Sequence, residues 1–130
     1  MRLLLDTHAL LWFIGGSREL SDRAREVIED PGNDVTVSVV SYWEIVIKVH
    51  KGRLQLPLPP PEWLAQNVDP YAFRLIPVER RDVEGLHRLG QPGEHADPFD
   101  RLLVATAQHR SLTLVTRDAH LSAYGVSLMW

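Results

Sequence analysis

Two short apolar segments constrain the fold of this chain more than any other feature. Residues 2–5 are Arg-Leu-Leu-Leu and lead into Asp6, and residues 35–40 contain only Val, Thr and Ser. The length and composition of both are typical of strands inside a sheet. Apolar residues at helical spacing follow each segment directly. The order strand, helix, strand, helix is the pattern of a parallel sheet, so the sequence predicts an α/β fold.

Capping and turn residues predict where the helices begin. We expect Asp6 to cap the first helix and Ser21 to cap the second. Residues 41–44, Ser-Tyr-Trp-Glu, match a capping box, which predicts a helix from there to Lys51. Four prolines between residues 57 and 61 predict a loop or arm within a single domain spanning residues 1–130. Further helices are expected from about residue 62, at 80–89, from 97 and briefly after 118, with strands at 74–78, 112–116 and 126–129.

Composition excludes several classes of protein. With 130 residues, 45% of them hydrophobic, the chain is long enough for one domain with its own core. It has no cysteine, which excludes a disulfide scaffold, a thiol nucleophile and a cysteine-based zinc site. The apolar run at residues 9–14 is too short to span a membrane, and no cleavable signal pattern precedes it. We therefore expect a soluble, cytoplasmic protein with no membrane partner.

Five acidic residues are predicted to gather at the carboxyl ends of the strands, where open parallel sheets bind ligands. Asp6 and Asp118 directly follow strands, and Glu44 lies one turn into a helix. Asp97 and Asp100 lie on the first turn of another helix. Carboxylate oxygens are the ligands that Mg²⁺ and Mn²⁺ prefer, and such a cluster would repel itself strongly without a cation. The pattern indicates a site for one of these ions.

Each of these acids also has a structural interpretation. Three of the aspartates are good N-caps, and Glu44 fits both the capping box and a helical ion pair with Lys48, four residues later. Asp100 is different, because Asp97 already caps its helix and a second acid at that spacing invites a cation. A second group of acids also crowds a helix start after a strand, and periodicity does not separate it from the five: Glu79, Asp82 and Glu84.

Other chemistries find little support. The six histidines lack the spacing that places two zinc ligands on one helix face, and no glycine-rich nucleotide-binding loop is present. His95 is a candidate contact to a substrate phosphate, with a surface histidine as the alternative. Trp12, Trp43 and Phe99 lie at core spacing in helices, which predicts packing rather than stacking on bases.

The net charge of −3 argues at first against a nucleic-acid partner, because phosphates favour clustered Lys and Arg. Without the five acids, however, 14 basic residues face 17 − 5 = 12 acidic ones. Of the 14 bases 12 are arginine, whose planar guanidinium suits phosphate. The net charge therefore argues neither for nor against a nucleic-acid partner, and we expect nucleic-acid binding to improve when a divalent metal is added.

Four segments resemble, in order, the signature segments of PIN-domain ribonucleases, above all those of VapC-type toxins from bacterial toxin–antitoxin pairs. They are Leu-Leu-Leu-Asp-Thr-His-Ala-Leu at 3–10, Ser-Tyr-Trp-Glu-Ile at 41–45, His-Ala-Asp-Pro-Phe-Asp-Arg-Leu-Leu-Val-Ala at 95–105 and Thr-Arg-Asp at 116–118. The resemblance covers essentially the whole chain. It implies a three-layer α/β/α PIN-like fold with a central parallel sheet of four to five strands.

The resemblance also implies residue roles. It points to an acidic pocket that binds Mg²⁺ or Mn²⁺ and hydrolyses RNA phosphodiester bonds without a side-chain nucleophile. The catalytic acids are then Asp6, Glu44, Asp100 and Asp118. The third position is ambiguous between Asp100 and Asp97; the family pattern favours Asp100 as the ligand, with Asp97 in support. Further supporting residues are Thr7, Thr116 and His95.

Partners follow from the same resemblance: an RNA substrate, a small VapB-like antitoxin, a homodimer and a toxin–antitoxin hetero-oligomer. Cleavage of tRNA, rRNA or mRNA would then inhibit translation and growth. Three alternatives compete. A Mg²⁺-dependent phosphatase needs a second acid where His8 stands, and a receiver-like signalling domain needs a late lysine, whereas the last lysine is Lys51. A catalytically silent PIN fold that only binds would not need all these acids.

Overall fold

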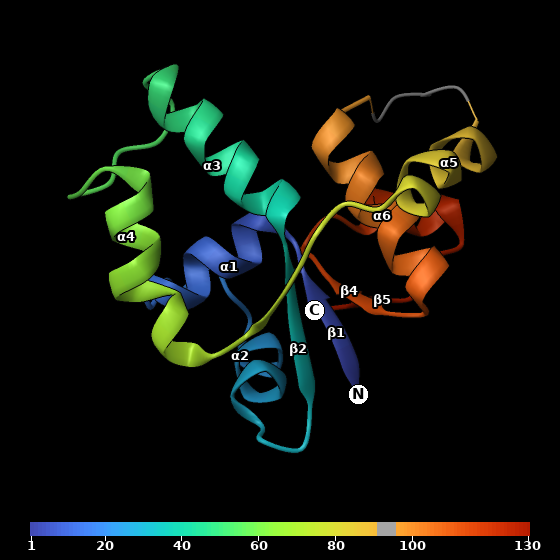
Figure 1. The fold of residues 1–130 in the computed structure, drawn as a ribbon. Helices are drawn as coiled ribbons and strands as arrows, with labels where there is room; N and C mark the ends of the chain where they lie inside the picture. Colours follow the sequence, from blue (N-terminus) through green and yellow to red (C-terminus); the bar gives the residue numbers. More distant parts are fainter. Residues whose placement is uncertain (91–95) are drawn as a thin grey trace.

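The computed structural model describes residues 1–90 and 96–130, and its centre is a parallel sheet (Figure 1). The sheet has the order β3-β2-β1-β4-β5, and every neighbouring pair is parallel. This confirms the predicted α/β class. The strands are β1 (Arg2–Leu5), β2 (Asp34–Ser38), β3 (Arg74–Ile76), β4 (Thr113–Val115) and β5 (Leu128–Met129).

Helices cover both faces of the sheet, which gives the three layers (Figure 1). Residues of α1 to α4 share one core cluster, and residues of α6 form the other, with α5 packed against α6. The helices are α1 (Thr7–Ile14), α2 (Asp22–Glu29), α3 (Val39–His50), α4 (Pro60–Asn67), α5 (Arg80–Leu89) and α6 (Pro98–Arg110), with short 3₁₀ helices η1 (Asp69–Tyr71) and η2 (Ala119–Tyr124). No helix in the described ranges is long and apolar enough to cross a membrane.

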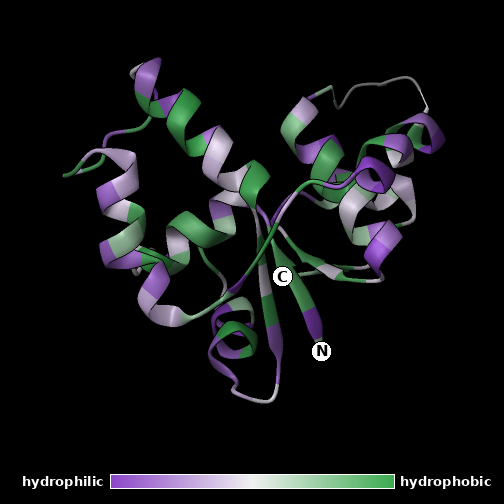
Figure 2. Cartoon of the chain, viewed as in Figure 1, coloured by the Kyte–Doolittle hydropathy of each residue, from purple (hydrophilic) through white to green (hydrophobic). Residues whose placement is uncertain are grey.

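The central strand β1 shows why the leucine run is so constraining. Leu3, Leu4 and Leu5 are all fully buried. Because successive side chains point to opposite faces, Leu3 and Leu5 pack into the cluster beneath α1 to α4, whereas Leu4 packs into the other. Figure 2 shows this strand as hydrophobic, with a hydrophilic end beside the N-terminus.

The start of α3 differs from the prediction. Ser38 caps the helix, its Oγ accepting a hydrogen bond from the Val40 amide at 3.1 Å, so the expected strand ends at Ser38 and the capping box starting at Ser41 does not form. Pairing with β3 ends at Ser38, and a good cap there outweighs the strand propensity of the two valines that follow. Ser41 therefore becomes a buried helix residue, and Glu44 lies in the helix interior beside it.

The predicted packing role of Trp43 is also wrong. Its side chain is 57% exposed and meets only the edge of Phe99, with ring centroids 4.8 Å apart. Trp12 and Phe99 are partly buried against the two core clusters, as expected. Helical spacing in the sequence does not distinguish an exposed position from a core position, because the difference depends on where the neighbouring helices pack.

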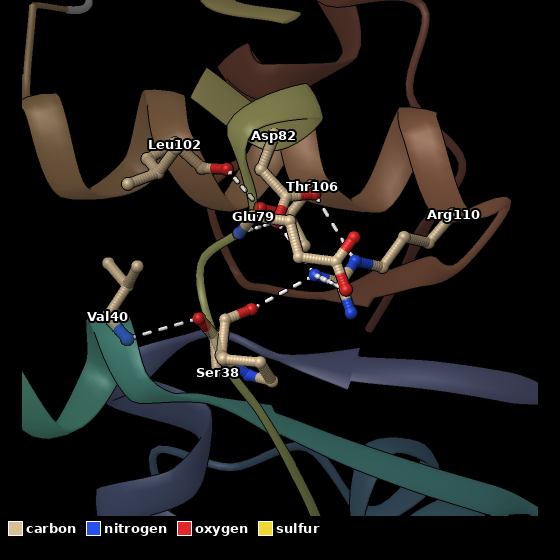
Figure 3. A network of polar contacts seen from close by, with 8 residues as sticks. Ser38, Val40, Glu79, Asp82, Leu102, Thr106 and Arg110 are labelled. Carbon is tan, nitrogen blue, oxygen red and sulfur yellow. Dashed lines mark hydrogen bonds and ion pairs between the residues drawn. The ribbon is translucent and has the colours of Figure 1, made fainter. Parts of the chain in front are cut away.

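A buried ion pair joins α5 to the end of α6. Asp82 is fully buried and accepts hydrogen bonds from Arg110 Nη2 at 2.7 Å and from the Glu79 amide at 2.8 Å. Arg110 Nη2 also donates to the Pro77 carbonyl at 3.0 Å, just after edge strand β3. Figure 3 shows Arg110 reaching back from α6 to this carboxylate. The network anchors the first turn of α5, so Asp82 is a structural acid.

Candidate active site

The carboxyl ends of β1 and β4 lie side by side, because Leu5 is paired with Val115 and the Asp6 amide donates to the Val115 carbonyl. Beyond this edge lies a pocket of about 270 Å³. Asp6 from the start of α1, Asp100 from α6, and Thr116 and Asp118 after β4 all line it. The fold thus brings three of the four predicted catalytic acids into one pocket.

Asp6 caps a helix and lines the pocket at once. Its Oδ1 accepts a hydrogen bond from the Ala9 amide at 2.6 Å, and the side chain is nearly buried. Burial raises the pKa of Asp6, and the charges of Glu44 and Asp118 act in the same direction. Hydrogen bonds from Thr116 and Ala9 oppose the rise in pKa without cancelling it. Asp6 is therefore an acid held in surroundings that disfavour its charge.

The two aspartates at the start of α6 have different positions. Asp97 is the N-cap, accepting hydrogen bonds from the amides of Phe99 and Asp100 at 2.8 and 3.0 Å, and it is exposed. It is not among the residues that line the pocket, whereas Asp100 is. The pocket therefore presents Asp100, the residue favoured by the family pattern.

Asp118 is fixed by its own loop. Its Oδ1 accepts from the His120 amide at 3.0 Å and lies 3.2 Å from His120 Nδ1. The Asp118 amide in turn donates to Thr116 Oγ1 at 3.1 Å. Since Thr116 also hydrogen-bonds Asp6, this hydroxyl links the two aspartates.

Glu44 lies apart from the other acids. It is 2% exposed and does not line the pocket; Thr7 Oγ1 donates to its Oε1 at 2.6 Å, and Lys48 Nζ lies 2.5 Å from its Oε2. The predicted ion pair with Lys48 is confirmed. Thr7, expected in a supporting role, is also 3.1 Å from Ser41 Oγ, so it joins α1 to α3. Glu44 still acts on the pocket through its charge on Asp6.

Three further residues form the rim of the pocket: His8, Trp12 and Arg117. The Arg117 guanidinium lies over the Trp12 ring, 4.6 Å from its centroid, and pairs with Glu19. The pKa of His8 is lowered, first by desolvation and then by the Lys48 ammonium. The sequence reasoning paired Lys48 with Glu44 but assigned neither Lys48 nor Arg117 to the site. The signal for Arg117 was its position between Thr116 and Asp118.

His95, the remaining predicted site residue, lies outside the described residues, so its contact with substrate stays a prediction.

The donor set of the pocket fits a partly hydrated divalent ion. Within the described ranges no three carboxylate or imidazole groups come together closely enough to enclose a metal. Mg²⁺, however, is usually held by one or two carboxylates and several waters. Asp6 and Asp118 are close enough for the charge of Asp118 to raise the pKa of Asp6. A bound cation would relieve this repulsion between the two carboxylates. Asp6 and Asp118, with Asp100 in the lining of the same pocket, would hold such an ion.

Comparison with known proteins agrees with this fold. The sequence model of the PIN domain matches residues 3–126. The chain belongs to the PIN-domain family.

Among curated relatives, Ribonuclease VapC22 of Mycobacterium tuberculosis is 30% identical over 124 residues, which cover 94% of this chain and 91% of the relative. Solved structures with a similar fold include VapBC2 from Rickettsia felis bound to a DNA fragment from its promoter, with 19% identity, a TM-score of 0.71 and coverage of 99% of this chain and 98% of that one. Mycobacterium tuberculosis VapC20, described as a sarcin–ricin loop cleaving toxin, has 16% identity, a TM-score of 0.66 and coverage of 95% of both chains.

Proposed function

We propose that this protein is a ribonuclease that depends on Mg²⁺ or Mn²⁺ and acts as the toxin of a toxin–antitoxin pair. The observation that carries the proposal is the convergence of Asp6, Asp100 and Asp118 from three elements on one pocket. Membership of the PIN family and the 30% identity to a VapC ribonuclease support the reaction class. The substrate is an RNA whose cleavage inhibits translation and growth.

The residues of the pocket are prepared for phosphodiester hydrolysis. When bound, a divalent ion supplies positive charge for the phosphate oxygens and activates water. Asp6 is held in place by the Ala9 amide and the Thr116 hydroxyl, and Asp118 by the His120 amide. These carboxylates need no reorganisation when the reaction begins, which favours catalysis. Asp100 lines the same pocket, and its charge acts on His8.

In this proposal Glu44 is not a direct ligand of the divalent ion. Its two oxygens already have partners, Thr7 and Lys48. Its buried charge makes ionised Asp6 more costly, and so makes a cation in the pocket more favourable. Glu44 therefore adds negative potential behind the pocket, and Lys48 holds it in place.

The partner is proposed to be a small antitoxin. Solved structures with this fold include FitAB bound to a DNA fragment and the VapBC complexes, in which toxin and antitoxin occur together. We propose that a VapB-like antitoxin binds this chain into a hetero-oligomer and covers the acidic pocket. A homodimer stays a prediction, which size-exclusion chromatography with light scattering tests.

The reaction is tested by expressing the chain in cells and sequencing RNA 5′ ends. New ends are expected with the wild-type chain and are expected to disappear with Asp6→Asn and Asp100→Asn. The matched control is Asp22→Asn, an exposed aspartate on α2 outside the pocket, which should cleave like wild type. If Asp6→Asn cleaves RNA at nearly the wild-type rate, the site is wrong; growth arrest without cleavage would point to a binding function. The purified chain should also lose cleavage in EDTA and regain it with Mg²⁺ or Mn²⁺.

A further inference from the structure

The rim of the acidic pocket carries a planar cation fixed on an aromatic ring. Arg117 lies on the loop after β4, and its guanidinium carbon is 4.6 Å from the centroid of the Trp12 ring in α1. Glu19, on the connection between α1 and α2, pairs with the same guanidinium. The two contacts orient a side chain that is otherwise 54% exposed. An exposed arginine held by a ring and a carboxylate from two other segments is pre-organised for recognition.

Trp12 is itself supported from two more sides. The His8 ring lies 5.2 Å away at a tilt of 35°, and the Trp130 ring meets Trp12 edge-on at 5.9 Å. The ring is partly buried against the core. The surface formed by Trp12 and Arg117 is therefore rigid, and its accessible part is the side of the guanidinium turned away from the ring.

This surface lies beside the predicted catalytic acids. Trp12 and Arg117 line the same pocket as Asp6, Asp100 and Asp118. That pocket, at about 270 Å³, is smaller than the roughly 300 Å³ at which small-molecule sites begin. A pocket of this size fits a reacting phosphate with its immediate neighbours, so we expect the base attached to the next sugar to lie at the rim.

We propose that Arg117, backed by Trp12 and held by Glu19, is a stacking site for one unpaired RNA base next to the cleaved phosphate. Proteins recognise single-stranded RNA by stacking splayed bases on aromatic rings and on guanidinium planes. The charge of the arginine also offsets the acidic pocket for an incoming phosphate backbone. The site makes cleavage selective for the base at one position. This inference rests on the proposed ribonuclease activity and adds a determinant of specificity.

The test uses a pool of random single-stranded RNA, cleaved by purified protein in Mg²⁺ and sequenced at the new ends. The wild-type chain is expected to show a base preference at a position flanking the cut. Arg117→Lys keeps the charge but loses the plane, so it should reduce the preference at that position about tenfold and leave the other positions unchanged. Trp12→Leu and Glu19→Gln should reduce the same preference. The matched control is Arg23→Lys on α2, an exposed arginine remote from the pocket, which should cleave like wild type.

An abasic RNA identifies the contact directly. Once the preferred base is known, its removal should slow the wild-type chain about tenfold but leave Arg117→Lys unaffected, because the variant no longer contacts that base. Thermal unfolding of each variant shows whether it is folded; if Trp12→Leu is not, Arg117→Lys and Glu19→Gln carry the test alone.

The outcomes separate the two proposals. If wild type and Asp6→Asn give the same RNA ends, the ribonuclease proposal fails and the stacking site fails with it. If cleavage depends on Asp6 but Arg117→Lys and Glu19→Gln keep the wild-type preference at every position, only the stacking site is overturned. It is equally overturned if these variants cut with an unchanged pattern but escape neutralisation by a co-expressed antitoxin, since the surface then recognises a protein.

Discussion

Asp82 and Asp6 are both buried aspartates at the start of a helix after a strand, yet their surroundings have opposite effects on their pKa. Around Asp82, burial alone would raise the pKa, but the Arg110 guanidinium and the Glu79 amide outweigh burial and lower it. Around Asp6, burial raises the pKa, and Glu44 and Asp118 raise it further. The Arg110 guanidinium balances the charge of Asp82, whereas the charges that act on Asp6 are those of two further carboxylates. This difference supports the proposal that Asp82 is a structural acid and Asp6 a functional one.

The largest expected effect comes from breaking the paired acid. Asp82→Ala should destabilise the fold by about 3 kcal/mol, because it leaves the Arg110 charge poorly compensated at a site that is only 18% exposed. Urea unfolding monitored by circular dichroism measures this. The control is Glu84→Gln, which removes an exposed ion pair with Arg80 and should cost less than about 0.5 kcal/mol. A loss below 1 kcal/mol for Asp82→Ala would contradict the structural role.

These acids also show where sequence reasoning reached its limit. Glu79, Asp82 and Glu84 could not be separated by periodicity from the acids of the pocket, because each group lies where a strand leads into a helix. What separates them is Arg110, 28 residues beyond Asp82 along the chain. Partners at that separation are set by how α5 packs on α6, which no local pattern contains.

Local patterns were sufficient where the determining contacts are local. The caps of α1 and α6, Asp6 and Asp97, were predicted because a cap bonds to amides two or three residues away. The parallel sheet followed from the leucine and valine runs. The start of α3 was misplaced by three residues, because the competition between Ser38 and Ser41 depends on where pairing with β3 ends.

The pocket was predicted more from the resemblance to PIN-domain ribonucleases than from the spacing of the acids. The residues at strand ends indicated that acids would meet, and the four-residue spacing indicated the pair of Glu44 with Lys48, but no local pattern indicated that Thr7 would bond to Glu44 from another helix. Nor did they predict that Arg117 would lie on Trp12, 105 residues earlier in the chain. Both findings depend on side chains from separate elements meeting at one edge of the sheet.

A divalent ion should stabilise the fold through the pocket around Asp6 and not through the ion pair of Asp82. If the pocket binds Mg²⁺, an ion concentration of 100 times its dissociation constant stabilises the fold by about 2.7 kcal/mol. Thermal unfolding with and without Mg²⁺ should show this rise for wild type and for Glu84→Gln, and no rise for Asp6→Asn or Asp118→Asn. A rise that survives in both aspartate variants would place the ion elsewhere.

Removing the charge of Asp6 should have a smaller effect of opposite sign. Asp6→Asn keeps a side-chain oxygen to accept from the Ala9 amide and removes a charge that Glu44 and Asp118 repel. In metal-free buffer this variant should have a higher free energy of unfolding than wild type. The gain should be smaller than the loss caused by Asp82→Ala. The pKa of Asp6 is raised in the folded state above the usual 3.8, so its protonated form favours folding.

The advantage of Asp6→Asn should therefore depend on pH in a defined direction. Below about 3.8 Asp6 is protonated in both the folded and unfolded chains, so variant and wild type should be equally stable in this respect. As pH rises through the raised pKa of the folded state, wild type loses stability relative to the variant, and the difference levels off above that pKa. The contribution of Asp82 runs the other way: its lowered pKa gives stability above 3.8 that is lost in acid. Urea unfolding of the three chains between pH 3 and 8 measures both trends, and an Asp6→Asn advantage that grows in acid would show that the two aspartates do not differ as described.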